Sequence, residues 1–223
     1  VNNDLYDDVI VGAPDWDQLG SPTYYDEGRA YLFLGSASGL SAAPDGTLGP
    51  TNESYANFGA AVAGAGDVNA DGFDDLVVGA PGYYGTTSSE GAAFLYLGSA
   101  AGLEATPAWT VEPTDNYGAQ FGVSVAAAGD VDADGYDDVL VGADRYGVAF
   151  TQEGRIYLFN GSSAGLSEYG WSVDEINQTY AYLGSCVGGG DFDDDGFNDL
   201  IGGASGWDAP RGAGLNQGRG YLY

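Results

Sequence analysis

A nine-residue acidic segment occurs three times in this chain, and this repetition limits the fold more than any other feature. The copies are DVNADGFDD at 67–75, DVDADGYDD at 130–138 and DFDDDGFND at 191–199, so their starts lie 63 and 61 residues apart. An incomplete fourth copy opens the chain, because VNNDLYDDVIVGAP at 1–14 aligns with VNADGFDDLVVGAP at 68–81. Repeats of this length predict a fold built from equivalent structural units.

Each repeat unit contains four short segments that predict β-strands. In one unit they lie at about 58–66, 75–80, 91–98 and 107–112, rich in β-branched or aromatic residues and bounded by Gly, Pro or Asp. The first segment is almost all Ala, Gly, Ser and Val, which suits a crowded position near an axis. Trp109 and Trp171 in the last segments would fill a wider outer gap. We therefore predict an all-β fold, a β-propeller of four-stranded antiparallel blades.

The order of these segments predicts two complete and two partial blades. Residues 1–50 hold the last three strands of one blade, 51–112 and 113–174 each hold a complete blade with an acidic loop, and 175–223 hold the first three strands of another, with its own loop. These 14 strands would make about half of a seven-bladed ring. The chain also does not begin with Met. We therefore expect a processed or excised piece of a longer chain, or a unit that pairs with other copies through its open strand edges.

The phrases around the acidic loops resemble a known family. Phe-Gly at 58 and 121, Gly-Ala-Pro at 12 and 79, and the DxDxDGxxD pattern between them are similar to the FG-GAP repeats of integrin α-subunit propellers and their relatives. The resemblance covers essentially the whole chain and implies a calcium-binding propeller, usually of seven blades. The sequence departs from the pattern where Leu183 replaces the Phe, and where Asp144 and Ser205 replace the Pro.

The acidic loops need cations that the protein itself does not supply. The formal net charge is -28, with five Arg, no Lys and no His. Two carboxylates about 5 Å apart repel by about 3 kcal/mol at an effective dielectric constant of about 20. Roughly six to eight oxygen ligands suit Ca²⁺, whereas Zn²⁺ would favour His or Cys. We therefore predict that each complete loop binds one calcium ion, three in all.

Alternate residues of a tight loop point inward, which sets the predicted ligands. Positions 1, 3, 5 and 9 offer side-chain oxygens, position 7 offers its carbonyl, and position 8 points away from the ion. A glycine at position 6, with positive φ, makes the sharp turn. The predicted ligands are Asp67, Asn69, Asp71, Phe73 and Asp75 in the first site, Asp130, Asp132, Asp134, Tyr136 and Asp138 in the second, and Asp191, Asp193, Asp195, Phe197 and Asp199 in the third.

A fourth site at the start of the chain is predicted to be weakened or absent. It lacks an Asp at position 1, and Leu5 stands where the other loops have glycine. Its remaining ligands would be Asn2, Asp4, the carbonyl of Tyr6 and Asp8.

The acidic loops and the whole chain allow other interpretations. Solvated acidic turns would use the same residue types. An EF-hand-like loop fits poorly, because its last carboxylate falls at position 12 and a helix follows. The lack of His, and of a His partner for the single Cys186, argues against an enzyme, although a polysaccharide lyase or hydrolase that uses carboxylates stays open. Cys186, in the run LGSCVGGGD, is expected to be a small buried residue.

The loops at the other end of the predicted blades are rich in aromatic residues. Loops between second and third strands, and the connectors between blades, would lie opposite the calcium loops, and they hold Trp16, Tyr24, Tyr25, Tyr83, Tyr84, Tyr146, Trp207, Tyr55, Tyr117 and Tyr180. Exposed Tyr and Trp are typical of binding surfaces, but about half of these rings would instead pack between blades. We predict recognition of a protein or glycan ligand there, with calcium in a structural role.

The expected location is extracellular or at the cell surface. Three glycosylation sequons begin at Asn52, Asn160 and Asn177, which fits a secreted protein. The acidic charge disfavours nucleic acid and anionic membranes, and no apolar run approaches the ~20 residues of a membrane span, so neither nucleic-acid binding nor membrane insertion is expected. The leading prediction is an adhesion or recognition module, and the alternative is a structural subunit of an extracellular filament or surface layer.

Overall fold

The chain folds into β-strands and connecting loops. The computed structural model describes residues 1–17, 25–49, 53–85, 90–112, 118–147, 151–167, 169–174, 178–208 and 217–223. Within these ranges there are fourteen strands and no helix, and therefore no helix that could cross a membrane. The strands are β1 (Val9–Ala13), β2 (Arg29–Phe33), β3 (Gly46–Leu48), β4 (Ala61–Gly66), β5 (Asp75–Ala80), β6 (Ala92–Tyr96), β7 (Trp109–Val111), β8 (Phe121–Gly129), β9 (Asp138–Ala143), β10 (Arg155–Phe159), β11 (Tyr169–Val173), β12 (Leu183–Gly190), β13 (Asp199–Ala204) and β14 (Arg219–Leu222).

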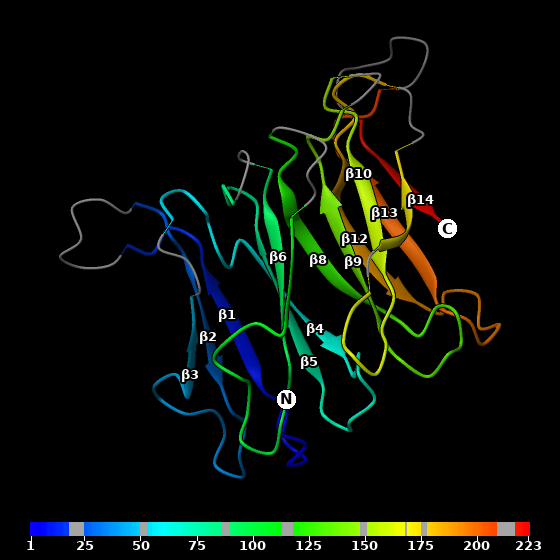
Figure 1. Ribbon diagram of the computed structural model, residues 1–223. Helices are drawn as coiled ribbons and strands as arrows, with labels where there is room; N and C mark the ends of the chain where they lie inside the picture. Colours follow the sequence, from blue (N-terminus) through cyan, green and yellow to red (C-terminus); the bar gives the residue numbers. More distant parts are fainter. Residues whose placement is uncertain are drawn as a thin grey trace.

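Consecutive strands pair antiparallel to form four separate sheets. Their orders are β1-β2-β3, β4-β5-β6-β7, β8-β9-β10-β11 and β12-β13-β14. Figure 1 shows the sheets standing side by side in chain order, with β4, β8 and β12 as the strands through which neighbouring sheets meet. The predicted all-β fold of four-stranded antiparallel propeller blades is confirmed.

The repeated glycines lie where neighbouring sheets touch. A Cβ built on Gly79, the glycine of the second GAP phrase, would lie 1.9 Å from the carbonyl oxygen of Gly122, the glycine of the next FG phrase. Gly122 has φ +85, a left-handed conformation that side-chain-bearing residues rarely adopt. The same contact recurs between Gly142 and Gly184. The FG and GAP phrases therefore mark the two sides of one contact between blades.

Adding a methyl group at this contact is expected to destabilise the chain. Gly79→Ala would force the second and third sheets apart, and we expect a loss of about 2 kcal/mol in the free energy of unfolding, within the usual range for overpacking. Gly64→Ala is the matched control, because Gly64 lies on β4 with no atom within 4 Å of an added Cβ. Urea unfolding of both variants measures the difference. Equal stability would contradict this account of the contact.

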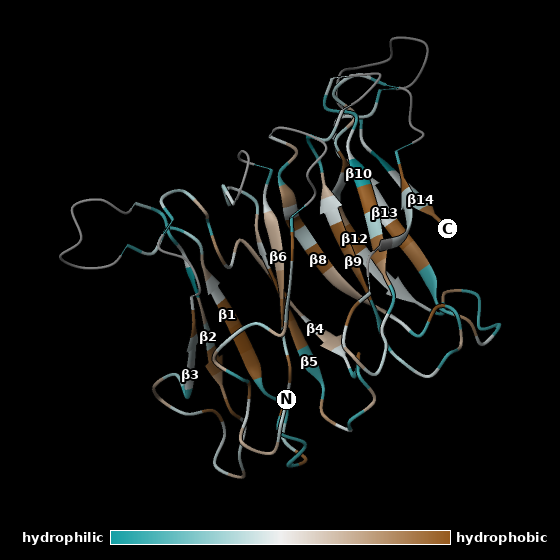
Figure 2. Ribbon diagram, in the orientation of Figure 1, coloured by the Kyte–Doolittle hydropathy of each residue, from teal (hydrophilic) through white to brown (hydrophobic). Residues whose placement is uncertain are grey.

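The apolar side chains gather between the sheets. Each of three hydrophobic clusters combines buried residues from two neighbouring sheets, and in Figure 2 the strands carry most of the hydrophobic colour while the loop ends are hydrophilic. Trp109 of β7 packs edge-on against Phe159 of β10 with ring centroids 5.0 Å apart, and Trp171 of β11 packs in the same way against Tyr223 at 5.3 Å. As the sequence predicts, large rings fill the gaps between the outer strands.

The first and last sheets expose apolar residues that the inner sheets bury. Val11 of β1 is 46% exposed, and Ile201 of β13 and Leu222 of β14 are 42% and 60% exposed, whereas β5 and β9 are buried throughout. The prediction that Cys186 is buried is wrong, because this residue is exposed on β12. Its sequence neighbours resemble those of buried strand residues, but no described segment covers that part of the last sheet.

Candidate metal centres

The three acidic loops share one backbone conformation. Each follows the first strand of its sheet and leads into the second strand, so all three lie at the same end of the molecule (Figure 1). The predicted positive φ at position 6 is confirmed, since Gly72, Gly135 and Gly196 all have φ +93. Position 4 also has a left-handed backbone, at Ala70, Ala133 and Asp194, and the sequence does not predict this.

Hydrogen bonds within each loop orient the carboxylates. In the first loop, the Asp67 carboxylate accepts from the backbone N–H groups of Asp71 at 3.0 Å and Gly72 at 2.8 Å. The N–H of Phe73 in turn donates to Asp71 Oδ1 at 3.0 Å. The second and third loops repeat these bonds at equivalent positions. The backbone thus folds around its own acidic side chains.

The carboxylate at position 9 is buried in the first two loops. Asp75 is 1% exposed, and its two oxygens accept from the N–H groups of Val68 at 3.1 Å and Gly98 at 2.8 Å. Burial raises the pKa of Asp75 to about 6, because the low-dielectric surroundings disfavour its charged form more than these hydrogen bonds favour it. Burial also raises the pKa of Asp138, which has the equivalent partners Val131 and Gly161.

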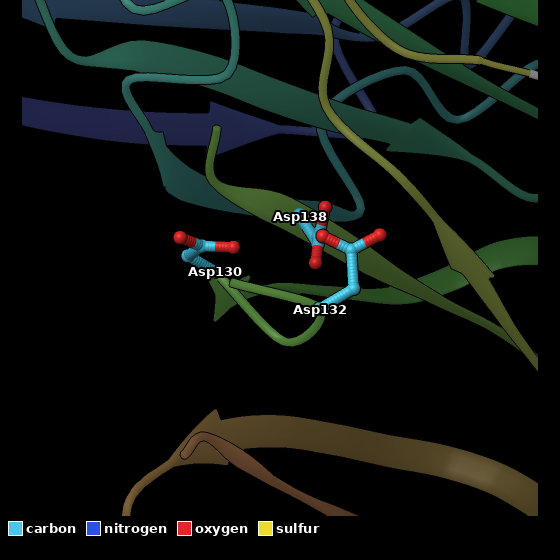
Figure 3. A group of neighbouring side chains, drawn as sticks. All are labelled: Asp130, Asp132 and Asp138. Carbon is cyan, nitrogen blue, oxygen red and sulfur yellow. The ribbon is translucent and has the colours of Figure 1, made fainter. Parts of the chain in front are cut away.

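Two groups of carboxylates come close enough to share an ion. Asp130, Asp132 and Asp138 each offer an oxygen within 4.8 Å of the others, and Figure 3 shows the three side chains around one space. Asp191, Asp193 and Asp195 form a similar group in the third loop. Like charges this close repel by about 3 kcal/mol per pair. Oxygen ligands without His or Cys fit Ca²⁺.

Other predicted ligands stand outside these two groups. Asp134 and Asp199 belong to neither, and Tyr136 and Phe197 would act only through their carbonyls. In the first loop, Asn69 occupies position 3, where its amide donates to Asp71 Oδ2 at 2.9 Å, and no three-carboxylate group forms among the described residues. The ligand sets therefore stay predictions.

The loop at the start of the chain differs from the other three. Leu5 adopts φ 76 with a side chain that is 95% exposed, so a strained leucine takes the place of the glycine. Asn2 donates to Asp4 at 3.2 Å and Asp8 accepts from the N–H of Gly35 at 2.9 Å, as the equivalent residues of the first loop do. The weakened fourth site stays a prediction.

Asn160, beside the second loop, makes a contact with the acidic side chains that the sequence does not predict. Asn160 begins a sequon, yet its side-chain amide donates to Asp132 Oδ2 at 2.6 Å, so a glycan on this nitrogen would compete with that contact. The equivalent residues in the two preceding sheets are Leu34 and Leu97, and this change within the repeat is the only signal of the contact in the sequence. Asn52 and Asn177 lie outside the described residues.

The aromatic residues at the opposite end divide into packed and exposed rings. Tyr146 is 3% exposed beneath the guanidinium of Arg155, so its predicted exposure is wrong. In the same way, the guanidinium carbon of Arg29 lies 3.5 Å from the ring centroid of the partly buried Trp16. The described exposed rings are those of Tyr25, Tyr55, Tyr84 and Tyr180, those of Tyr83 and Trp207 are partly buried, and Tyr24 and Tyr117 lie outside the described residues.

Comparison with known proteins places these features in a family context. The FG-GAP repeat model matches residues 58–96 and 121–159. The chain is 39% identical over 145 residues to integrin alpha-IIb of Mus musculus, covering 64% of this chain and 14% of that protein. It is 36% identical over 160 residues to integrin alpha-4 of Xenopus laevis, covering 72% and 14%, and 29% identical over 191 residues to integrin alpha-5 of Xenopus laevis, covering 84% and 18%. The chain thus spans less than a fifth of these relatives.

Proposed function

From the FG-GAP repeats that this chain shares with its homologues, the integrin α subunits, we propose that it is an extracellular or cell-surface adhesion module that recognises a protein or glycan partner. Calcium in the three acidic loops has a structural role at one end of the blades. The partner binds at the opposite end. We assign the chain no catalytic residue.

The donor sets support calcium as the resident ion. Position 1 of each loop and the buried Asp75 and Asp138 present carboxylate oxygens from a backbone that is already folded around them. Calcium, when bound, would neutralise these groups and tie the two ends of each loop together. The chain has neither His nor Lys, so a cation from solution is the available counter-charge in these loops.

Two strained, exposed tyrosines carry the proposal of a recognition surface. Tyr55 and Tyr180 have φ 66 and 61, and their side chains are 58% and 52% exposed. A left-handed conformation costs a side-chain-bearing residue about 1 to 2 kcal/mol. Gly118 holds the equivalent place before the third sheet with φ 71, so glycine satisfies this backbone without strain. Because an exposed ring adds little to the core, we infer that these rings serve contacts with a partner.

The surroundings of Tyr55 give the surface its chemistry. Its ring stacks on that of Tyr25 with centroids 6.3 Å apart, and the backbone of Tyr84 is held by the carboxylate of Glu53. Flat aromatic faces beside carboxylates suit a sugar ring or a peptide with Lys or Arg. Both classes of partner therefore belong in the test.

Replacing a strained tyrosine should separate binding from folding. The native chain is screened against immobilised glycans and a displayed library of random peptides, and the strongest binder is kept as the probe. We expect Tyr55→Gly to weaken its binding at least tenfold while the melting temperature stays equal or rises, because glycine relieves the strain. Phe192→Ala is the control, since Phe192 is 55% exposed in an acidic loop. If Phe192→Ala abolishes binding and Tyr55→Gly does not, the acidic end is the functional one.

The exposed apolar edges favour a second candidate, a structural subunit of an extracellular assembly. Val11 on β1 and Leu222 on β14 would be covered if further blades, of this chain or of another, continued the row. Light scattering of the purified chain distinguishes the two functions. Long assemblies that form without any partner would support the structural subunit.

A further inference from the structure

Asp137, at position 8 of the second acidic loop, contacts the first loop. Its Oδ2 accepts a hydrogen bond from the backbone N–H of Asp67 at 2.8 Å. Its own backbone N–H donates to the carbonyl oxygen of Asp67 at 3.3 Å. Both backbone groups of the position-1 residue in one loop are therefore paired with a single residue of the next loop. The sequence predicts only that position 8 points away from its own ion.

A second connection runs beside the first. The N–H of Ser162 donates to the carbonyl oxygen of Val68 at 3.0 Å, while the N–H of Gly161 donates to Asp138 Oδ1 at 2.8 Å. Val68 is fully buried, and its own N–H donates to Asp75. The turn after β10 therefore bonds to position 9 of the second loop and to position 2 of the first.

The glycines before the first and second loops make room for this contact. A Cβ on Gly66 would lie 2.1 Å from Asp137 Oδ2, and a Cβ on Gly129 would lie 2.1 Å from the side-chain amide nitrogen of Asn198, the position-8 residue of the third loop. Asp137 and Asn198 are half-buried at these contacts. By contrast, Asp74, at position 8 of the first loop, is exposed. The position-8 residues of the second and third loops therefore both pack against the glycine that precedes the loop before them, and the first loop has no complete loop before it.

We propose that Asp137 is a positioning residue that couples the first and second calcium sites, so that occupation of one raises the affinity of the other. This inference rests on the calcium binding proposed above. Ligation by Asp130 and Asp138 immobilises the second loop and therefore Asp137. A fixed Asp137 holds the backbone of Asp67, which lowers the entropy that the first loop loses when it closes on its own ion. Coupling of this kind is reciprocal.

The amide signals of Gly72 and Gly135 report the two sites separately. Each N–H donates to the position-1 carboxylate of its own loop, at 2.8 and 2.9 Å, so calcium on that carboxylate shifts its nuclear magnetic resonance signal. The calcium titrations are done at about 0.15 M salt, because this salt screens the repulsion between charges that are farther apart than about 8 Å. Asp134→Ala disables the second loop. We expect it to weaken the first site, read at Gly72, about fivefold.

Substitutions at position 8 isolate the hydrogen bond from the charge. When Asp137→Ala is already present, adding Asp134→Ala should not change the calcium concentration at which the Gly72 signal is half shifted. Asp137→Asn loses the same charge but keeps an oxygen acceptor, as at Asn198, and should retain the fivefold effect. Asp74→Ala, the matched control at an exposed position 8, should retain it too.

The outcomes separate this inference from the proposed calcium binding. If neither glycine signal moves with calcium, the calcium sites themselves are refuted. If both signals move but Asp134→Ala leaves the Gly72 midpoint of the native background unchanged, the sites are independent and the coupling is refuted. Equal behaviour of Asp137→Ala and Asp137→Asn would also overturn it, because it would assign the effect to charge.

Discussion

Removal of calcium is expected to lower the free energy of unfolding by about 8 kcal/mol when the ion had been present at a hundredfold excess over its dissociation constant. An ion that binds only the folded state contributes about 2.7 kcal/mol per site under that condition, and three complete loops are predicted to bind. In addition, the second and third loops each keep three carboxylates close together when the ion is removed. Calorimetric titration of the metal-free chain should give close to three sites. No binding, or a clear preference for zinc, would refute the assignment.

A single ligand substitution tests the register of the predicted sites. Asp134→Ala removes position 5 of the second loop and should abolish most of that site's contribution, about 2 to 3 kcal/mol in saturating calcium. Asp74→Ala is the matched control, because this exposed position-8 carboxylate is not a predicted ligand. Asp137→Ala is a poorer control, since it also breaks the hydrogen bond to Asp67. Equal losses of melting temperature in the Asp134 and Asp74 variants would contradict the register.

Features that depend on local sequence could be predicted well. The second strand of the first complete blade is expected at 75–80 and is observed at Asp75–Ala80, because a continuously apolar run bounded by Asp and Pro has few other structures available. The turn at Gly72 and its equivalents follows from the need for positive φ in a nine-residue loop. Repetition also supplied the sheet order, since equivalent segments must pair in equivalent ways.

Features that depend on contacts between separate loops and strands could not be predicted in the same way. Tyr146 is buried because Arg155 lies over its ring, and Asn160 meets Asp132 because the turn after β10 folds against the acidic loop. The partner of Asp137 lies 70 residues earlier in the chain. No local pattern contains such a distance. Comparison of equivalent positions, such as Asn160 with Leu97, indicates where to look but does not identify the contact.

The pH dependence of stability is expected to disappear above about pH 5 when calcium is added. In the metal-free chain the folded state raises the pKa of Asp75 from 3.8 to about 6, so between these values the folded state binds more protons than the unfolded state. Its contribution to stability is then complete below pH 3.8 and is lost as the pH rises through about 6. The loss for this buried group is about 3 kcal/mol. The raised pKa of Asp138 acts in the same direction.

Calcium binds the ionised carboxylates, so in saturating calcium neither the folded nor the unfolded state holds a proton on Asp75 above about pH 5. Stability should then stay nearly constant from about pH 5 to about pH 7. Urea unfolding at about pH 5, 6 and 7, with metal-free and calcium-loaded protein, measures both slopes. Asp75→Asn removes the titrating group. Although it also disturbs one of the hydrogen bonds from Val68 and Gly98, it should flatten the metal-free slope, because the slope depends only on protons bound. A falling slope that persists in saturating calcium would show that Asp75 does not face the ion, and position 9 would then have to be withdrawn as a ligand.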